Sequence, residues 1–227
     1  VTYLLDIPPV VDAGPDQAIC FTDSVTLTAS GDAILYQWNN GVIDGVPFSP
    51  VATNSYVVIG TAANGCLEAD TVEVVVNPLP VITANASDDV ICDGESTILW
   101  GEGASIYAWD QGVTDSVSFI PGSTSTYTVI GYDINGCTDT TDIEVIVNPL
   151  PDVLFSTDMT YGGCVPFSPT FTDLTNGPSS ESVLWVFGNG ASSTQMGSVI
   201  NTYDSYGCYN VTLIRTTSEG CTDSPDS

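Results

Sequence analysis

The stretch Val76-Asn77-Pro78-Leu79-Pro80 recurs unchanged as Val147-Asn148-Pro149-Leu150-Pro151, 71 residues further along the chain. The same offset relates Asn64-Gly65-Cys66 to Asn135-Gly136-Cys137. Self-similarity at a fixed period is typical of tandem modules. The linkers are little more than Asn-Pro-Leu-Pro, and proline restricts the backbone to extended conformations. The sequence therefore predicts repeats of about 71 residues joined into a semi-rigid string.

Apolar and polar residues alternate within each repeat, as in Val25, Leu27 and Ala29. A period of two with many β-branched residues predicts strands. Turn signals such as Asn40-Gly41 separate the strands, and no stretch shows a helical stripe. The predicted fold is all-β, with immunoglobulin-like β-sandwich modules in a row.

The repeat period divides the chain into four segments. We predict that residues 1–7 are the last strand of a preceding repeat, and that 8–78 and 79–149 form the first and second repeats. Residues 150–227 form a third repeat, whose final strand we expect to be missing. We favour a window cut from a longer polypeptide. The alternative is that the N-terminal strand of one copy completes the open third repeat of the next copy, which would build filaments.

The charge of the chain excludes several classes of partner. It has 28 acidic residues, one basic residue (Arg215) and no His, for a net charge of -27. Binding to phosphates or to anionic lipid surfaces requires Lys and Arg, so neither nucleic acid nor such membranes are expected partners. No run of about 18 apolar residues occurs, so membrane insertion is not predicted.

Seven cysteines favour disulfides, because the chain has no CxxC motif and no His to share a zinc ion. Disulfides persist in oxidising compartments, which predicts an extracellular location. Bridges within each repeat would close loops of roughly 45 residues and stabilise each by about 4 kcal/mol. The predicted pairs are Cys20 with Cys66, and Cys92 with Cys137. Trp38 and Trp109 are expected in the core, packed against these bridges.

Acidic residues suggest neither catalysis nor a firm metal site. Without His the commonest general base is absent, and compact sandwiches offer no obvious cleft between two carboxylates. Calcium is a candidate at Asp88-Asp89, Asp93 and Glu95, but no Asp-x-Asp-x-Asp-Gly loop is present. We favour a solvated acidic surface and predict no enzyme and no cofactor.

Trp100 breaks the repeat pattern. On the Cys20 to Cys92 offset, Thr97, Leu99 and Gly101 take the inward positions, which leaves Ile98 and Trp100 facing outward. An outward Trp could stack on a sugar ring. We favour packing on a neighbouring module or subunit, because Ile98 and Trp100 together form an apolar patch.

The third repeat differs from the other two and resembles a PKD domain over most of residues 152–223. The resemblance rests on Trp185-Val186-Phe187-Gly188-Asn189-Gly190 and on the strand at 207–213, although Val186 and Asn189 replace two Asp residues of the usual motif. The PKD pattern implies a bridge between Cys164 and Cys221 and leaves Cys208 free or bridged elsewhere. The alternative is a bridge between Cys164 and Cys208.

The first two repeats resemble the Ig-like repeats of large surface proteins that gliding bacteria export by type IX secretion. The resemblance covers residues 8–151 and rests on the Asp12–Gln17 segment, the Trp, the Tyr-Val-Val strand and the Asn-Gly-Cys turn. It implies export to the cell surface and a part in adhesion, gliding or filament building. O-glycans of that group attach to Asp-Ser/Thr motifs, which occur at four hydroxyl residues: Ser24, Thr71, Ser116 and Thr140.

These observations predict a structural segment of a large extracellular adhesin or filament, a disulfide-stapled rod at the cell surface. Expected partners are neighbouring modules of the same chain, further copies of the chain, and other surface proteins or glycans. The alternatives are a glycan-binding adhesin module and accessory modules of a secreted hydrolase.

Overall fold

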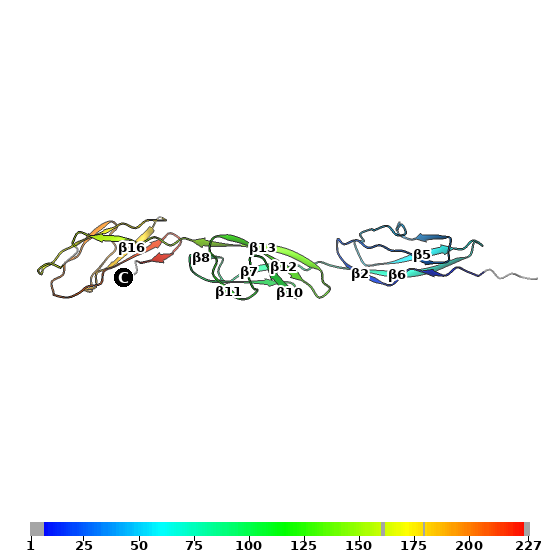
Figure 1. Ribbon diagram of the computed structural model, residues 1–227, viewed down its shortest axis with the longest axis horizontal. Coiled ribbons are helices and arrows are strands. Elements are labelled where there is room, and N and C mark those ends of the chain that lie inside the picture. The colour runs from blue at the N-terminus through cyan, green and yellow to red at the C-terminus, as the bar shows by residue number, and fades with distance from the viewer. Residues whose placement is uncertain (1–6, 160–161, 179, 225–227) are drawn as a thin grey trace, which may run out of the picture. The chain divides into compact units, whose positions relative to one another are not determined.

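The computed structural model describes residues 7–159, 162–178 and 180–224, and consists of strands and turns (Figure 1). The predicted all-β class is confirmed. Nothing in these ranges is a helix of the length and apolar character that would span a membrane. The strand predicted at the N-terminus, Val1–Leu5, lies outside the described residues.

The strands are β1 (Val11–Asp12), β2 (Gln17–Cys20), β3 (Ser30–Gly31), β4 (Leu35–Trp38), β5 (Asn54–Thr61), β6 (Leu67–Asn77), β7 (Thr83–Ala86), β8 (Val90–Cys92), β9 (Thr97–Glu102), β10 (Ile106–Trp109), β11 (Ser118–Phe119), β12 (Ser125–Tyr132), β13 (Thr138–Asn148), β14 (Phe155–Thr157), β15 (Thr170–Asp173), β16 (Ser180–Val186), β17 (Ser192–Ser193), β18 (Ser198–Ile200), β19 (Thr212–Thr217) and β20 (Thr222–Asp223).

The chain forms two compact units. The first comprises residues 1–84, 100–110 and 128–141, and the second comprises residues 85–99, 111–127 and 142–227. The repeats at 8–78 and 150–227 fall within the first and the second unit, respectively. The strands β7, β9, β12 and β13 of the second repeat run from one unit into the other.

In the first repeat, a four-stranded sheet in the order β2-β6-β5-β4 faces the short pair β1-β3 and the segment at Val25–Ala29. Side chains of Val25, Leu27 and Ala29 are buried, as their alternation predicts. β5 and β6 pair antiparallel along all of β5. β2 pairs parallel with the last residues of β6, which sets Cys20 beside Asn77.

Equivalent pairs recur in the second repeat, which confirms the tandem repeat in three dimensions. The strand orders are β10-β12-β13-β8 and β11-β9-β7. The equivalent pairs in the first and second repeats are Trp38–Val58 and Trp109–Val129, Cys20–Asn77 and Cys92–Asn148, and the edge-to-face rings Phe48–Tyr56 and Phe119–Tyr127.

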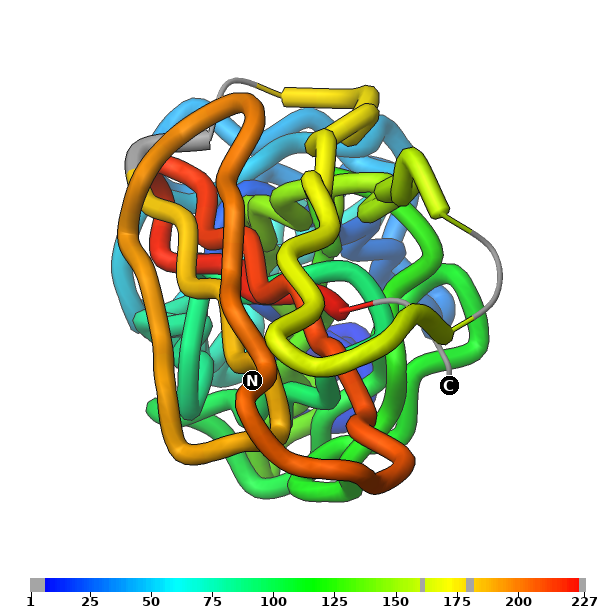
Figure 2. The backbone as a smooth tube through the Cα atoms, turned by 90° about the vertical axis from the view of Figure 1, so that its left-hand side faces the viewer, coloured from blue at the N-terminus to red at the C-terminus, as the bar shows by residue number. Residues whose placement is uncertain are grey.

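The third repeat has the same two-layer plan with a different core. Its sheets are β14-β15-β18 and β17-β16-β19-β20, and their extended segments run yellow to red in Figure 2. Trp185 is fully buried and lies against Phe155, Phe171 and Phe187. The two residues of β20 pair antiparallel with β19, where we expected the final strand to be missing.

Trp38 is a core residue, but it does not pack against a disulfide, so this part of the prediction is wrong. Trp38 pairs with Val58, which in turn pairs with Asp70. Cys20 lies beside Asn77, seven residues further along β6, or about 23 Å at the rise of a strand. The Trp38 indole N–H instead donates to Asp44 Oδ1 at 2.9 Å.

Candidate functional site

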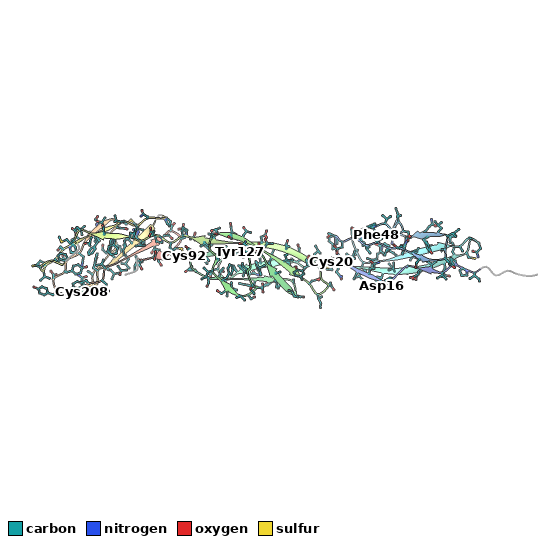
Figure 3. The ribbon with its side chains drawn as sticks, in the orientation of Figure 1. Asp16, Cys20, Phe48, Cys92, Tyr127 and Cys208 are labelled. Atoms are coloured by element: carbon teal, nitrogen blue, oxygen red, sulfur yellow. A yellow bond between two sulfur atoms is a disulfide. The ribbon has the colours of Figure 1, made fainter. Side chains whose placement is uncertain are left out.

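The bonded cysteines form two bridges that run between repeats. Cys20 of the first repeat is bonded to Cys137 of the second, with Cα atoms 5.5 Å apart. Cys92 of the second repeat is bonded to Cys221 of the third, with Cα atoms 5.6 Å apart. Each bridge lies within one of the compact units, and Figure 3 labels Cys20 and Cys92.

The first cysteine of each bridge ends a strand that is held against the last strand of its repeat. The amide after Cys20, that of Phe21, donates to the Asn77 carbonyl at 2.8 Å. The Cys20 amide donates to the Asp23 carboxylate at 3.2 Å, and Asp23 donates its own amide back to the Cys20 carbonyl. These reciprocal bonds fix the backbone that carries the Cys20 sulfur.

Cys92 has the same local structure. The amide of Asp93 donates to the Asn148 carbonyl at 2.9 Å, and the Cys92 amide donates to Glu95 Oε2 at 2.8 Å. Glu95 donates its amide to the Cys92 carbonyl at 3.0 Å. Glu95, proposed from sequence as a calcium ligand, therefore caps the chain at the disulfide. In the described ranges no three His, Cys, Asp or Glu residues are placed to hold a metal ion.

The second cysteine of each bridge ends a tight turn between the last two strands of its repeat. Before Cys137, Asp133 Oδ1 accepts from the Cys137 amide at 2.8 Å, and the Asp133 amide donates to the Cys137 carbonyl at 2.9 Å. Gly136 has a φ of +83°, which side-chain-bearing residues rarely adopt, so glycine is required there. The turn thus presents Cys137 in one fixed backbone geometry.

The turn at Cys221 repeats this geometry. The Cys221 amide donates to Thr217 Oγ1 at 3.1 Å, and the Thr217 amide donates to the Cys221 carbonyl at 2.8 Å. Gly220 has a φ of +88°. Once bonded, both turn cysteines are buried, with exposed fractions of 1% for Cys137 and 0% for Cys221.

The predicted bridges within the first two repeats, Cys20–Cys66 and Cys92–Cys137, are wrong. Cys20 lies beside Asn77, the last residue of β6, whereas Cys66 directly precedes the first. Eleven residues of strand separate these ends, or about 36 Å, against the roughly 7 Å limit between bonded Cα atoms. β8 and β13 repeat this register. A single repeat therefore cannot bond its own two cysteines.

The bridge predicted within the third repeat, between Cys164 and Cys221, is also wrong. Cys221 follows the end of β19 and is bonded to Cys92. Gly163 and Val165, on either side of Cys164, line a cavity together with Tyr209 and Val211. Those last two residues precede the start of β19, so Cys164 and Cys221 lie near opposite ends of this strand.

Three cysteines, Cys66, Cys164 and Cys208, have free thiols. The alternative pair Cys164–Cys208 is thus not formed either. Cys208 lies at the end of the third repeat away from Cys92 (Figure 3).

The outward residues proposed for surface contact alternate as predicted. Thr97 and Leu99 are buried, while Ile98 and Trp100 are half-buried on the other face of β9. The Trp100 indole N–H donates to Glu102 Oε1 at 3.3 Å. All four proposed glycosylation sites, Ser24, Thr71, Ser116 and Thr140, are exposed. Their modification and the contact role of Ile98 and Trp100 stay predictions.

The third repeat contains a cavity of about 320 Å³ that sequence reasoning missed. Its lining includes Phe167, Tyr203, Tyr206 and Tyr209. The Tyr203 hydroxyl donates to the Phe187 carbonyl at 3.0 Å, and burial raises the pKa of Tyr203. Tyr206 is 88% exposed and presents its ring to solvent at the rim. The three tyrosines at positions 203, 206 and 209 are the sequence feature from which this cavity could have been predicted.

The architecture is similar to that of solved tandem immunoglobulin structures. The N-terminal eight Ig domains of Down Syndrome Cell Adhesion Molecule are 17% identical, with a TM-score of 0.44, and the match covers 96% of this chain and 41% of that one. A three-domain titin fragment is 10% identical, with a TM-score of 0.46, and 97% of each chain is covered.

A Ca²⁺-stabilised adhesin with which an Antarctic bacterium binds ice is 14% identical, with a TM-score of 0.40, and the match covers 97% of this chain and 72% of that one. No protein-family model and no curated protein matches the sequence. Likeness at these identities concerns the β-sandwich fold and carries no argument about activity or ligands.

Proposed function

We propose that the chain is a structural segment of a large extracellular cell-surface adhesin, in which disulfides tie each repeat to the next. The observation that carries the proposal is the direction of the bridges: Cys20–Cys137 and Cys92–Cys221 both join successive repeats. The repeat boundaries at 8–78, 79–149 and 150–227 are part of this proposal. Disulfides at structural positions fit an oxidising compartment outside the cell.

The two bridges overlap in sequence, which shortens the covalent path along the chain. Cys92, the start of the second bridge, lies inside the loop closed by the first. The shortest covalent path from residue 1 to residue 227 follows the backbone to Cys20 and crosses the first disulfide to Cys137. It then follows the backbone back to Cys92, crosses the second disulfide to Cys221, and continues to residue 227. It contains about 70 residues, or about 250 Å fully extended, against about 790 Å for the unbridged chain. Bridges of this kind limit how far a stalk lengthens when force unfolds its repeats.

Pulling single molecules from residue 1 to residue 227 tests this role. We expect the oxidised chain to reach about 250 Å and the reduced chain about 790 Å before detaching. A chain carrying both Cys20→Ser and Cys137→Ser keeps the second bridge and should reach about 340 Å. If the oxidised chain extends as far as the reduced chain, the bridges do not limit extension and the proposal fails.

The cellular part of the proposal is tested on intact cells of the source organism. Antibodies against this chain should label unbroken cells, and protease added outside should remove the label. Export by type IX secretion, a part in gliding, assembly into filaments and O-glycosylation at Ser24, Thr71, Ser116 and Thr140 belong to the same proposal. Electron microscopy of shed material and its intact mass test filaments and glycans. Label confined to broken cells contradicts a surface role.

A glycan-binding module is the second candidate, because the third repeat has an aromatic-lined cavity. Tyr206 has an exposed ring and lines this cavity together with Tyr209 and Phe167, and aromatic faces stack on apolar sugar faces. A glycan array probed with the chain should then show binding that Tyr206→Ala weakens at least tenfold. Tyr132→Ala, which removes an exposed tyrosine of β12 outside the cavity, is the matched control. Binding that Tyr206→Ala leaves unchanged excludes this cavity.

A further inference from the structure

The turn at Cys66 has the same geometry as the two bridged turns. The Cys66 amide donates to Asn64 Oδ1 at 3.0 Å, and the Ala62 amide donates to the Cys66 carbonyl at 2.9 Å. The Gly65 amide donates to the Ala62 carbonyl, and Gly65 has a φ of +86°. Equivalent carbonyl bonds and glycine conformations occur at Cys137 and Cys221.

Cys66 differs from its equivalents in being free. Its thiol is unbonded and half-exposed, whereas Cys137 and Cys221 are bonded and buried. Each of those two is bonded to a cysteine of the repeat before its own, at separations of 117 and 129 residues. Cys20 and Cys92 are already bonded, so neither provides the thiol that would complete the first turn.

The segment that enters the first repeat passes beside this turn. The Asn64 side-chain amide donates to the Ile7 carbonyl at 3.3 Å. Asn64 also accepts from the Cys66 amide, so one side chain joins the incoming backbone to the turn. A repeat that precedes residue 8 would therefore have its end held beside the turn that carries Cys66.

We propose that Cys66 is one half of a third bridge, whose other half is the strand-end cysteine of a preceding repeat built like residues 8–78. This inference rests on the proposed function, since it extends the same direction of bridging by one repeat. The partner is a protein segment with a parallel strand pair ending in a cysteine, as at Cys20 and Asn77.

Bond formation follows thiol–disulfide exchange. The preceding cysteine first forms a mixed disulfide with a small disulfide oxidant, and the Cys66 thiolate then attacks that sulfur. One protein S–S bond forms and the S–S bond of the oxidant breaks. The two protein thiols lose two protons and two electrons, and the oxidant leaves as two thiols. Oxidised glutathione is the oxidant used in the test below.

The test extends the whole chain by one repeat. A copy of residues 8–78 is placed directly before Pro8, which sets the Cys20 of the copy 117 residues before Cys66, the spacing of the Cys20–Cys137 bridge. The copy carries Cys66→Ser, so that a single Cys66 remains. A matched control copy carries Cys20→Ser as well. Both proteins and the unextended chain are folded with oxidised glutathione and an excess of reduced glutathione, which releases glutathione from any lone cysteine. They are then alkylated and mapped as peptic peptides.

We expect Cys66 to be alkylated in the unextended chain and in the control, and at least tenfold less alkylated in the chain with the intact copy. Cys137 must stay protected in all three, which excludes capture of the original Cys20 by Cys66. Full alkylation of Cys66 beside the copy, with Cys20–Cys137 and Cys92–Cys221 intact, overturns this inference and leaves the proposed function standing. Loss of those two bridges from all three proteins overturns both.

Discussion

The first and third repeats fold into the same two-layer plan around cores of different chemistry. The first is filled mainly by small and branched side chains such as Leu27, Val58 and Val72, with Trp38 at its margin. The third is filled by aromatic rings around Trp185 and contains the single cation of the chain.

What the two repeats share lies at their ends rather than in their cores. Cys66 and Cys221 end turns with the same backbone hydrogen bonds and the same left-handed glycine. A core tolerates different residues when its volume stays filled. A bridge between repeats requires both sulfurs within a narrow distance, so it depends on the turn geometry. The turns and strand ends are therefore the parts that bridging between repeats constrains.

The largest effect is expected in the aromatic core of the third repeat. Phe187 is buried and stacks on Trp185 with ring centroids 6.3 Å apart. Phe187→Ala should destabilise this repeat by about 3–5 kcal/mol. Hydrogen exchange should accelerate in β16 and β19 by about two to four orders of magnitude and stay unchanged in β5 and β6.

The exposed Ile200 on β18 supplies the control for this prediction. Ile200→Ala should change the stability of the third repeat by less than about 0.5 kcal/mol. Equal acceleration of exchange in the first and third repeats after Phe187→Ala would show that the repeats unfold as one body, which removes the basis for treating their cores separately.

The ion pair of the third repeat is the next largest contribution. Arg215 on β19 reaches Asp173 on β15 at 3.3 Å, with side chains 13% and 8% exposed. Arg215→Met leaves the Asp173 charge without its cation and should cost about 3 kcal/mol. Hydrogen exchange of the β16 and β19 amides measures the loss.

A second variant separates charge from packing at this ion pair. Adding Asp173→Leu to Arg215→Met removes the unpaired charge and should recover at least half of the lost stability. A double variant that is less stable than the single one would mean that Asp173 acts mainly through its bond to the Thr175 amide.

The pairing of the cysteines could not be predicted from the sequence. Offsets of 71 and 72 residues related Cys66 to Cys137 and Cys20 to Cys92, and the alternation of Val25, Leu27 and Ala29 gave the buried face. Predicting the disulfide pairs required knowing that Cys20 lies beside one end of the 11-residue strand β6, whereas Cys66 directly precedes its other end. The alternation of Val72, Val74 and Val76 made the part of this strand next to the linker readable from the sequence. The parallel pairing of β2 with the far end of β6 was not, because it depends on contacts distant in sequence.

The Asp44 carboxylate should have a smaller effect, confined to the first repeat. Asp44 Oδ1 accepts from the Ala29 amide at 2.8 Å and from the Trp38 indole at 2.9 Å. Asp44→Ala leaves both donors without this acceptor and should cost about 1–2 kcal/mol. Asp44→Asn keeps an oxygen at the same place and should cost less than half as much. Exchange rates of the β4 and β5 amides distinguish them, and equal losses would mean that charge matters more than the hydrogen bonds.

Asp70 should contribute the smallest effect, visible at acidic pH. Hydrogen bonds from the Ala13 and Thr71 amides lower the pKa of its carboxyl group. The unfolded chain, with an ordinary Asp pKa of about 3.9, therefore binds this proton more readily than the folded chain. The stabilisation is complete above that value and is lost as pH falls through the lower folded pKa. Asp70→Asn should flatten the decline in first-repeat stability below about pH 4, measured by urea unfolding at several pH values.

Asp142, exposed on β13, provides the control through Asp142→Asn, which should leave the decline unchanged. An equal flattening in both variants would assign the decline to overall charge, because the chain is strongly acidic throughout.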